Sequence, residues 1–285
     1  MRKTVRALVT GGVALALMAS GTAASASPTE KNDRCAVLIL GENGTLSRHD
    51  CGRALLPTWS KRISGVAKGD RLIGLDTRPA TGALYSLAAS GQLYRIDAKT
   101  AAATAIGAKN PLAGKAIGFD FNPAVDRIRV VTDTGLNLRL HPDTGAIAGT
   151  DTPLSYPGRA QTPRVAASGY TNSVAGATST ALYGLDSGQD TLVKQGSLPG
   201  ETPVVSPNTG QLTTIGKLGL NISSVNGFDI AGAAGPGTYD SRDYKAVAAV
   251  RARGIPFLVR IDLTTGRAHV VSPLLTKPVG LALTR

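Results

Sequence analysis

Residues 117–149 read IGFDFNPAVDRIRVVTDTGLNLRLHPDTGAIAG and contain four strand-like segments in succession. The segments are residues 117–121, 127–132, 136–141 and 146–149, with turn residues such as Pro123, Gly135 and Gly145 between them. Four short antiparallel strands within about 40–50 residues are typical of one blade of a β-propeller.

The same pattern occurs 44 residues earlier without a gap, so the unit is repeated. Gly74, Asp76, Pro79, Gly91, Arg95 and Thr100 align with Gly118, Asp120, Pro123, Gly135, Arg139 and Thr144. A repeat of this length indicates that one supersecondary unit is copied around a common core.

The first strand of the unit recurs at five places. They are Gly74-Leu75-Asp76, Gly118-Phe119-Asp120, Gly169-Tyr170-Thr171, Gly227-Phe228-Asp229 and Gly280-Leu281-Ala282-Leu283. The last copy has no strands after it, whereas the strands expected near residues 36–40, 45–49 and 59–64 lack a first strand. We therefore predict an all-β fold, a β-propeller of about five four-stranded blades, in which residues 278–283 complete the N-terminal blade and close the ring. A sixth blade is the alternative if the weak fourth copy contains further strands.

Composition agrees with this fold class. The chain has 285 residues, of which 42% are hydrophobic and only 18% charged, so it can bury a core and is not expected to be disordered. Thirty-four glycines and sixteen prolines suit many short strands joined by tight turns.

The first 26 residues have the pattern of a signal peptide. Arg2, Lys3 and Arg6 precede an apolar stretch at residues 7–19, and Ala24-Ser25-Ala26 is a cleavage pattern of small residues. A membrane span needs about 20 apolar residues, and this stretch is shorter. We predict a secreted, extracellular protein with residues 27–285 as a single propeller domain.

The charge of the chain bears on its partners. Removing the three basic residues of the signal peptide lowers the net charge from +12 to +9. Export and the scattered placement of Lys and Arg argue against a nucleic-acid partner. An anionic wall polymer or membrane surface remains an alternative to a merely solvated basic surface.

Two cysteines flank an expected hairpin. Cys35 and Cys51 enclose two apolar-rich segments joined by a turn at residues 41–44, so the thiols should lie opposite each other. We predict a disulfide. The alternative is a reactive or metal-binding pair of thiols, but no His/Cys cluster accompanies the two residues.

A basic residue recurs inside the third strand of every unit. These residues, which we call the basic ring, are Arg48, Arg95, Arg139, Lys194 and Arg260. Because blades pack face to face, we expect these charges to be buried and paired with carboxylates such as Asp76, Asp120 and Asp229 at the ends of first strands. The structural interpretation is an inter-blade network; the functional alternative is a ring of anion ligands.

Two further groups are candidate ligand-binding residues. Tyr156, Arg159 and Arg164 lie in the long link at residues 150–164, and long loops on rigid scaffolds often carry function. Arg127 and Arg129 share a strand face in the third unit, where they either form an anion pocket with Asn137 and Arg139 or pair with nearby Asp residues such as Asp126.

Catalytic patterns are scarce. His49 and His141 follow third strands and look like turn residues, and His269 has no accompanying motif. Residues 186–190 resemble part of a calcium loop without its downstream Glu. We predict no cofactor and no metal site.

Several of these runs resemble a known family. Residues 117–123, 126–131 and 137–139, together with 78–85 and 170–173, are similar to the signature of the bacterial family called domain of unknown function 4394. The resemblance covers nearly all of the mature chain. It implies an exported, propeller-like protein without an established activity, and it transfers no catalytic residues.

Two functions of different classes remain. We expect a monomeric, non-enzymatic scaffold that binds an extracellular protein, peptide or anionic wall polymer. The alternative is an extracellular hydrolase or lyase that acts on a polymer with acids near the central channel.

Overall fold

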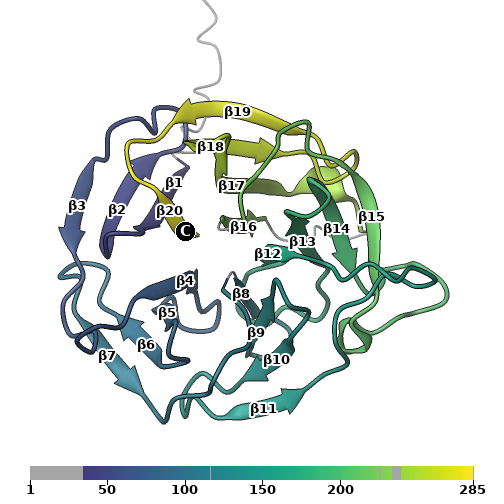
Figure 1. Cartoon of the computed structure of the whole chain (residues 1–285), viewed down its shortest axis with the longest axis horizontal. Helices are drawn as coiled ribbons and strands as arrows, with labels where there is room; N and C mark the ends of the chain where they lie inside the picture. Colours follow the sequence, from purple (N-terminus) through teal and green to yellow (C-terminus); the bar gives the residue numbers. More distant parts are fainter. Residues whose placement is uncertain (1–34, 116, 225, 233–238, 285) are drawn as a thin grey trace, which may run out of the picture. The chain divides into compact units, whose positions relative to one another are not determined.

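Five four-stranded antiparallel sheets surround a common centre in the computed structural model (Figure 1). The structure describes residues 35–115, 117–224, 226–232 and 239–284. These residues belong to one compact unit, and the predicted signal peptide lies outside them. The prediction of five blades is confirmed.

Each blade runs from an inner strand at the centre to an outer strand at the rim, and the blades are numbered in chain order. Blade one contains β20 (Pro278–Thr284), β1 (Ala36–Gly41), β2 (Thr45–Asp50) and β3 (Trp59–Arg62). Blade two contains β4 (Leu72–Thr77), β5 (Leu84–Ala88), β6 (Leu93–Ile96) and β7 (Ala103–Ile106). Blade three contains β8 (Ile117–Asn122), β9 (Arg127–Thr132), β10 (Asn137–Leu140) and β11 (Ile147–Thr150). Blade four contains β12 (Val165–Tyr170), β13 (Leu182–Asp186), β14 (Thr191–Gln195) and β15 (Leu212–Lys217). Blade five contains β16 (Gly227–Ala231), β17 (Lys245–Ala252), β18 (Ile255–Ile261) and β19 (Ala268–Pro273).

The two ends of the propeller meet in blade one. The C-terminal strand β20 is the inner strand of this blade and pairs with β1 from Ala36–Thr284 to Gly41–Pro278. The predicted ring closure is therefore confirmed, and β20 covers the edge of β1 that would otherwise be exposed.

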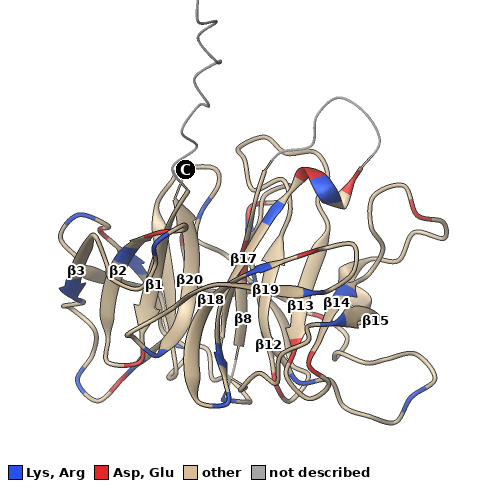
Figure 2. Cartoon of the chain, turned by 90° about the horizontal axis from the view of Figure 1, so that it is seen from above, with Lys and Arg blue, Asp and Glu red and all other residues tan. Residues whose placement is uncertain are grey.

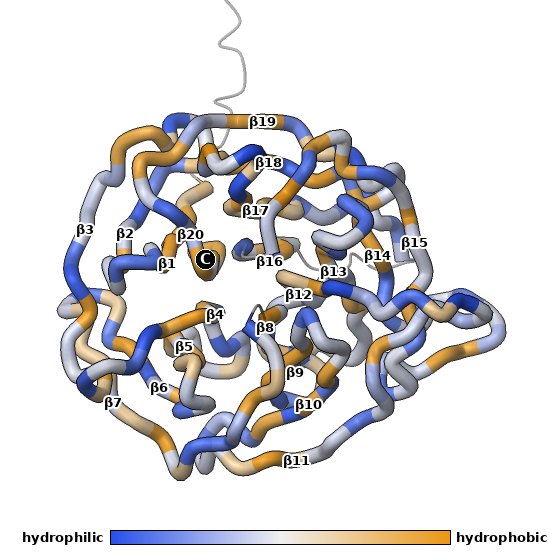
Figure 3. The backbone as a smooth tube through the Cα atoms, viewed as in Figure 1, coloured by the Kyte–Doolittle hydropathy of each residue, from blue (hydrophilic) through white to orange (hydrophobic). Residues whose placement is uncertain are grey.

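The hydrophobic core is divided among the interfaces between blades. One cluster joins Leu46 of blade one to Tyr94 and Ile96 of blade two, and another joins Phe121 of blade three to Tyr85 of blade two. Apolar residues lie along the strands around the centre (Figure 3). Because both faces of a blade pack against neighbours, a second strand can be buried throughout, as β5 and β13 are.

The turns between third and fourth strands follow from their residues. Asp97 accepts hydrogen bonds at Oδ1 from the backbone N–H of Lys99 and Thr100, and Asp262 does the same for Thr264 and Thr265. An Asp that caps its own turn in this way ends the strand and reverses the chain.

Blade four aligns differently from the prediction. Across the blades, Asp76 pairs with Tyr85 and Tyr85 with Arg95, and the matching series in blade four is Gly169, Tyr183 and Lys194. Gly169 therefore takes the position of the repeated Asp, not that of the repeated Gly. The alignment of Gly169-Tyr170-Thr171 with the other first strands was wrong by two residues.

The predicted disulfide is confirmed. Cys35 and Cys51 are bonded, with their Cα atoms 5.3 Å apart, and the Cys51 N–H donates to the Cys35 carbonyl. The bond follows from the register of β1 and β2, since Ala36 lies opposite Asp50.

The distribution of charge and the length of the helices also bear on the expectations from the sequence. Lys and Arg are spread over several blades rather than gathered on one strand (Figure 2). Among the residues that the structure describes, no helix is long and apolar enough to cross a membrane.

Candidate functional site

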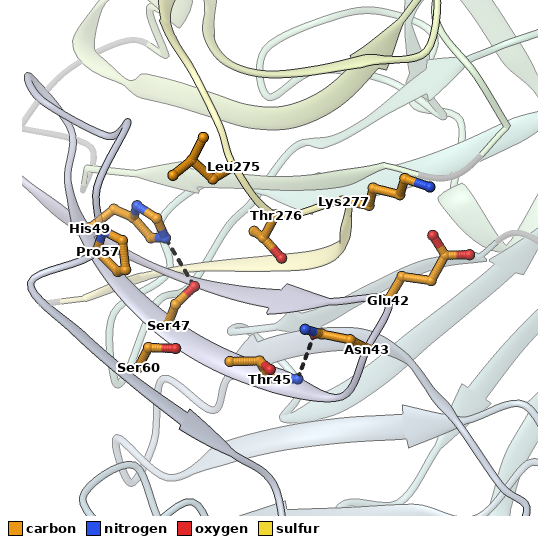
Figure 4. Close-up of a pocket in the computed structure, with 10 residues that line it drawn as sticks. All are labelled: Glu42, Asn43, Thr45, Ser47, His49, Pro57, Ser60, Leu275, Thr276 and Lys277. Carbon is orange, nitrogen blue, oxygen red and sulfur yellow. Dashed lines mark hydrogen bonds between the residues drawn. The ribbon is translucent and has the colours of Figure 1, made fainter.

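A groove opens between blade one and the segment that leads from blade five into β20. It has a volume of about 680 Å³ (Figure 4). Its walls come from β2, from β3 and from the loop before β20. The lining residues are Glu42, Asn43, Thr45, Ser47, His49, Pro57, Ser60, Leu275, Thr276 and Lys277. We call this site the blade-one groove.

Ser47 and His49 form a hydrogen-bonded pair on the groove wall. The Ser47 hydroxyl lies 2.9 Å from His49 Nε2, and His49 Nδ1 lies 2.7 Å from the Ala54 carbonyl oxygen. A carbonyl only accepts, so Nδ1 carries the proton and the neutral ring accepts from Ser47 at Nε2. The Ile39 carbonyl is a weaker acceptor for the same hydroxyl, at 3.4 Å.

The loop after β2 holds the carbonyl that orients His49. This loop begins at Cys51, whose disulfide to Cys35 fixes it against β1, and Ala54 within it is fully buried. It ends where the Thr58 N–H donates to the Arg48 carbonyl. The disulfide therefore lies at the start of the loop that orients the histidine.

Burial keeps His49 neutral. Only 2% of the residue is exposed, and desolvation lowers its pKa below the ordinary value of 6.5, against an opposing effect of the hydrogen bond to Ala54. A neutral imidazole with a free lone pair at Nε2 can accept a proton.

The repeat shows that this polar pair is not needed for the fold. The strand registers align Arg48 with the other basic-ring residues, Arg95, Arg139, Lys194 and Arg260. Ser47 precedes Arg48 in β2, so its counterparts are the residues that precede those four. The pairs that match Ser47 and His49 are Tyr94 and Ile96, Leu138 and Leu140, Val193 and Gln195, and Val259 and Ile261. All eight are buried, and seven are apolar. In blade one the two corresponding residues are polar, are buried as well, and lie on the wall of a groove.

The rim of the groove combines charge and apolar surface. The Glu42 carboxylate is half exposed and lies 3.4 Å from an Arg251 nitrogen, and Lys277 is exposed beside it. On the other side Leu275 is 71% exposed and Leu56, next to Pro57, is 64% exposed. Exposed apolar side chains around a groove are typical of an interaction site.

The expected anion pocket in blade three is already filled by the protein. Arg129 is 1% exposed and donates to Asp151, Asn137, Asn208 and the Tyr170 hydroxyl. Arg139 donates two hydrogen bonds to the same Asp151. Burial alone would raise the pKa of Asp151, but the two guanidinium groups lower it overall. Arg129 and Arg139 are therefore paired with a carboxylate, but the partner is Asp151 of the link and not Asp120, Asp126 or Asp133, which were expected.

Arg127 lies apart from this network. It is partly exposed and donates to the carbonyl oxygens of Val125 and Asp126, its own turn. It and Arg129 do not share one pocket.

The expected burial of the basic ring is wrong, because three of its residues are exposed and Arg139 and Lys194 are only half-buried. Arg48, Arg95 and Arg260 are exposed, while Arg139 pairs with Asp151 and Lys194 with Glu201. The register explains why the acids Asp76, Asp120 and Asp229 are not their partners. Each Asp is on the first strand and each basic residue on the third strand of a blade, so the second strand separates them. In blade two, Tyr85 of the second strand lies between Asp76 and Arg95.

The three acids instead link neighbouring inner strands. Asp76 accepts from the Phe121 N–H, Asp120 from the Tyr170 N–H and Asp229 from the Leu283 N–H, at 2.6–2.8 Å. In each of these hydrogen bonds the carboxyl group and the N–H belong to neighbouring blades, so the bonds connect the inner strands at the centre of the ring.

Burial and mutual repulsion shift these carboxyl groups. Desolvation and the nearby charge of Asp229 raise the pKa of Asp76 to about 7, and burial with the charge of Asp76 raises the pKa of Asp120. Oxygens of the three groups lie within 4.8 Å of one another, which is close enough to share a cation. Their backbone donors explain their placement without one.

The link at residues 150–164 is only partly a surface loop. Tyr156 is buried and donates from its hydroxyl to Asp186, so it is not a surface contact for a ligand. Arg159 is exposed with its guanidinium 5.7 Å from the Tyr156 ring, and Arg164 is exposed against Gly188. None of these three residues lines the blade-one groove.

The sequence interpretation missed the Ser47–His49 pair. It treated His49 as a turn residue, whereas His49 lies within β2 and is buried. The available signal was the Ser-x-His spacing, which places both side chains on one face of a strand where other units are apolar.

Comparisons with known proteins identify a family of similar sequences. A model of the family described as Domain of unknown function (DUF4394) matches residues 45–282. No curated protein matches the chain. Among solved structures, "Dihydro-heme d1 dehydrogenase NirN in complex with DHE" is similar at 10% identity and a TM-score of 0.36, over 83% of this chain and 53% of that chain.

A second solved structure is PorZ, titled as an essential bacterial surface component of the type-IX secretion system of Porphyromonas gingivalis. It is similar at 15% identity and a TM-score of 0.38, over 80% of this chain and 26% of that chain. The chain thus spans about half of the first protein and a quarter of the second.

Proposed function

The chain belongs to the DUF4394 family, and we propose that it is an exported binding protein that holds a peptide segment of an extracellular partner in the blade-one groove. The observation that carries this proposal is the groove of about 680 Å³, at a place where the other blades pack apolar side chains. Binding pockets of proteins commonly have volumes of 300–1,000 Å³.

The lining favours a peptide over a polysaccharide. Sugar-binding sites usually present aromatic rings, and no Trp, Tyr or Phe lines this groove. Hydroxyl and amide groups of Thr45, Asn43 and Thr276 can bond a peptide backbone, while Leu275 offers a contact for apolar side chains. Glu42 and Lys277 add one charge of each sign.

The central channel gives little support to a polymer hydrolase that uses its acids. The cavity there, lined by residues such as Gly74, Phe119 and Gly280, has room for about 10 Å³. A polymer cannot enter it, and the acids already accept backbone hydrogen bonds.

A peptide selection tests the proposal. A library of random peptides displayed on phage is selected on the folded protein, and the enriched peptides are synthesised and titrated by calorimetry. We expect Leu275→Ser to weaken binding at least tenfold, because Leu275 is an exposed apolar contact. Val125→Ser is the matched control, since Val125 is 55% exposed on a turn of blade three.

Either of two results would reject the peptide proposal. One is that no peptide is enriched over an unrelated propeller. The other is that enriched peptides bind equally well to wild type and to Leu275→Ser.

Export is a separate part of the proposal. The disulfide and the basic, apolar and small-residue pattern of residues 1–26 support it. N-terminal sequencing of the protein from culture medium should give Ser27 as the first residue. Protein that stays in the cell with Met1 intact would contradict export.

A further inference from the structure

The Ser47–His49 pair has the arrangement of an activated nucleophile. Ser47 Oγ lies 2.9 Å from a lone pair on Nε2, and Nδ1 is fixed 2.7 Å from the Ala54 carbonyl. A hydroxyl, a base and a group that orients the base are the three parts that nucleophilic catalysis by serine requires. All three parts belong to one strand and the loop that follows it.

The rest of the chain shows that the pair is not a packing requirement. Four other blades place Tyr, Leu or Val at the position of Ser47, and three place Ile or Leu at that of His49. In those blades the side chains fill the space toward the preceding blade, as Val259 and Ile261 do. In blade one this face lines an accessible groove of about 680 Å³.

We propose that Ser47 is a nucleophile, with His49 as its general base, and that the blade-one groove carries out acyl transfer from a carboxylic ester. This inference goes beyond binding, and it uses the same groove as the proposed function. It does not require the peptide to be the physiological ligand.

The reaction balances with water as the second substrate. Ser47 Oγ bonds to the ester carbonyl carbon while its proton passes to His49 Nε2. The tetrahedral intermediate then expels the alcohol oxygen, which takes that proton, and leaves an acyl group on Ser47. Water attacks this acyl group and gives a proton to Nε2, and the carboxylic acid leaves as Oγ recovers the proton.

The orienting group favours esters over amides. Nδ1 donates to a neutral carbonyl, whereas an ionised carboxylate would stabilise the imidazolium more strongly. An amide nitrogen must be protonated by the imidazolium before it leaves, while an alcohol leaves more readily. A weaker base–orienter pair therefore suits the easier substrate.

A fluorophosphonate probe tests the nucleophile without knowledge of the substrate. Activated serine attacks its phosphorus and releases fluoride, and peptide mass spectrometry locates the adduct. We expect the adduct on Ser47, with a labelling rate that rises with pH as His49 loses its proton. Hydrolysis of p-nitrophenyl acetate should show the same dependence.

The variants come from the other blades, so each is compatible with the fold. Ser47→Val reproduces the residue of blade five, and His49→Gln reproduces Gln195 of blade four. Labelling should disappear in Ser47→Val and slow at least 100-fold in His49→Gln. Ser179→Ala is the control, because Ser179 is an exposed serine of blade four outside the groove, so this variant should label at Ser47 as wild type does.

The proposal is overturned if excess probe at pH 8 leaves Ser47 unmodified in the wild-type protein. It is also overturned if labelling proceeds equally fast in His49→Gln. Peptide binding separates the two proposals: a wild-type protein that binds selected peptides but leaves Ser47 unlabelled keeps the binding function and rejects acyl transfer.

Discussion

Arg129 and Asp151 form a buried ion pair that ties the second strand of blade three to the link leading into blade four. The guanidinium is 1% exposed and the carboxylate side chain 6% exposed. The same guanidinium also donates from Nη2 to Oδ1 of Asn208 in blade four, at 2.7 Å. This pair therefore determines how blades three and four meet.

We expect Arg129→Met to destabilise the protein by about 3–5 kcal/mol, because it leaves the buried Asp151 with a partner missing. Arg95→Met should change the free energy of unfolding by no more than about 0.5 kcal/mol, since Arg95 is exposed. Urea denaturation of both variants checks the difference.

Arg95 lies on the third strand of blade two and makes no buried ion pair, so Arg95→Met controls for loss of a positive charge. A large loss of stability in Arg95→Met, or none in Arg129→Met, would mean that the burial of the basic residues is reversed from this structure. Arg159→Met should match Arg95→Met, because Arg159 is also exposed.

The disulfide should stabilise the protein and support the blade-one groove. It closes a loop with a sequence separation of 16, for which loop-closure entropy predicts about 3 kcal/mol. Cys35→Ser with Cys51→Ser should lower the urea midpoint accordingly. Mass spectrometry of non-reduced protein from the culture medium should show peptides joined through the two cysteines. Free thiols in both residues, or an unchanged midpoint, would contradict this.

The fold was predictable because its signals are local and repeated. Turn residues such as Pro79 and Pro123, and Thr100 and Thr144, recur 44 residues apart, and the terminal copy at residues 278–283 lacks the strands that follow elsewhere. Only blade four was misaligned. Its inner strand carries Gly169 where blades two, three and five carry Asp, so the strongest marker of the register is missing there.

The candidate site was less predictable because its contacts are not local in pattern. Asp151, the partner of Arg129, lies 22 residues away in a link with no repeat. The oriented His49 depends on the carbonyl of Ala54, and a backbone carbonyl leaves no trace in the residue type. The blades radiate from the centre, so the third strand of each blade lies toward the rim (Figure 1). The basic residues Arg48, Arg95 and Arg260 on these strands are exposed, which the sequence pattern did not indicate.

Ring closure can be tested at one glycine. A Cβ on Gly227 of β16 would lie 2.4 Å from the Leu281 backbone nitrogen and 2.5 Å from the Gly280 carbonyl carbon of β20. Gly227→Ala should therefore separate the inner strands of blades five and one and cost about 1–3 kcal/mol or more. Thermal melts check this.

Gly52→Ala is the control for that substitution. A Cβ at Gly52 meets its nearest neighbour, an oxygen of Asp50, at 3.5 Å, which is ordinary contact. Equal melting temperatures for both variants would show that β16 and β20 are not in close contact. Deletion of residues 278–285 should cause aggregation, because it exposes β1 as an edge.

The free energy of unfolding should fall as pH rises, because of the buried carboxyl groups at the centre of the ring. Asp76 has a pKa raised to about 7 in the folded protein, mainly by burial, against 3.8 when unfolded. Between these two pKa values the folded state binds more protons than the unfolded state. The contribution of protonated Asp76 to the free energy of unfolding is therefore complete below about pH 4 and is lost as pH rises through about 7. The shift corresponds to stability on the order of 4 kcal/mol.

Asp76→Asn removes this titration and keeps an oxygen that accepts from Phe121 N–H. Relative to wild type, the variant should therefore become more stable as pH rises from 4 to 8, as followed by urea denaturation at each pH. Asp97→Asn should leave the profile between pH 4 and 8 unchanged, because hydrogen bonds from the backbone of Thr100 and Lys99 lower the pKa of Asp97, and its stabilisation is lost only as pH falls below about 3.8. Parallel pH profiles for wild type and Asp76→Asn would show that Asp76 is ionised in the folded ring and that its raised pKa is wrong.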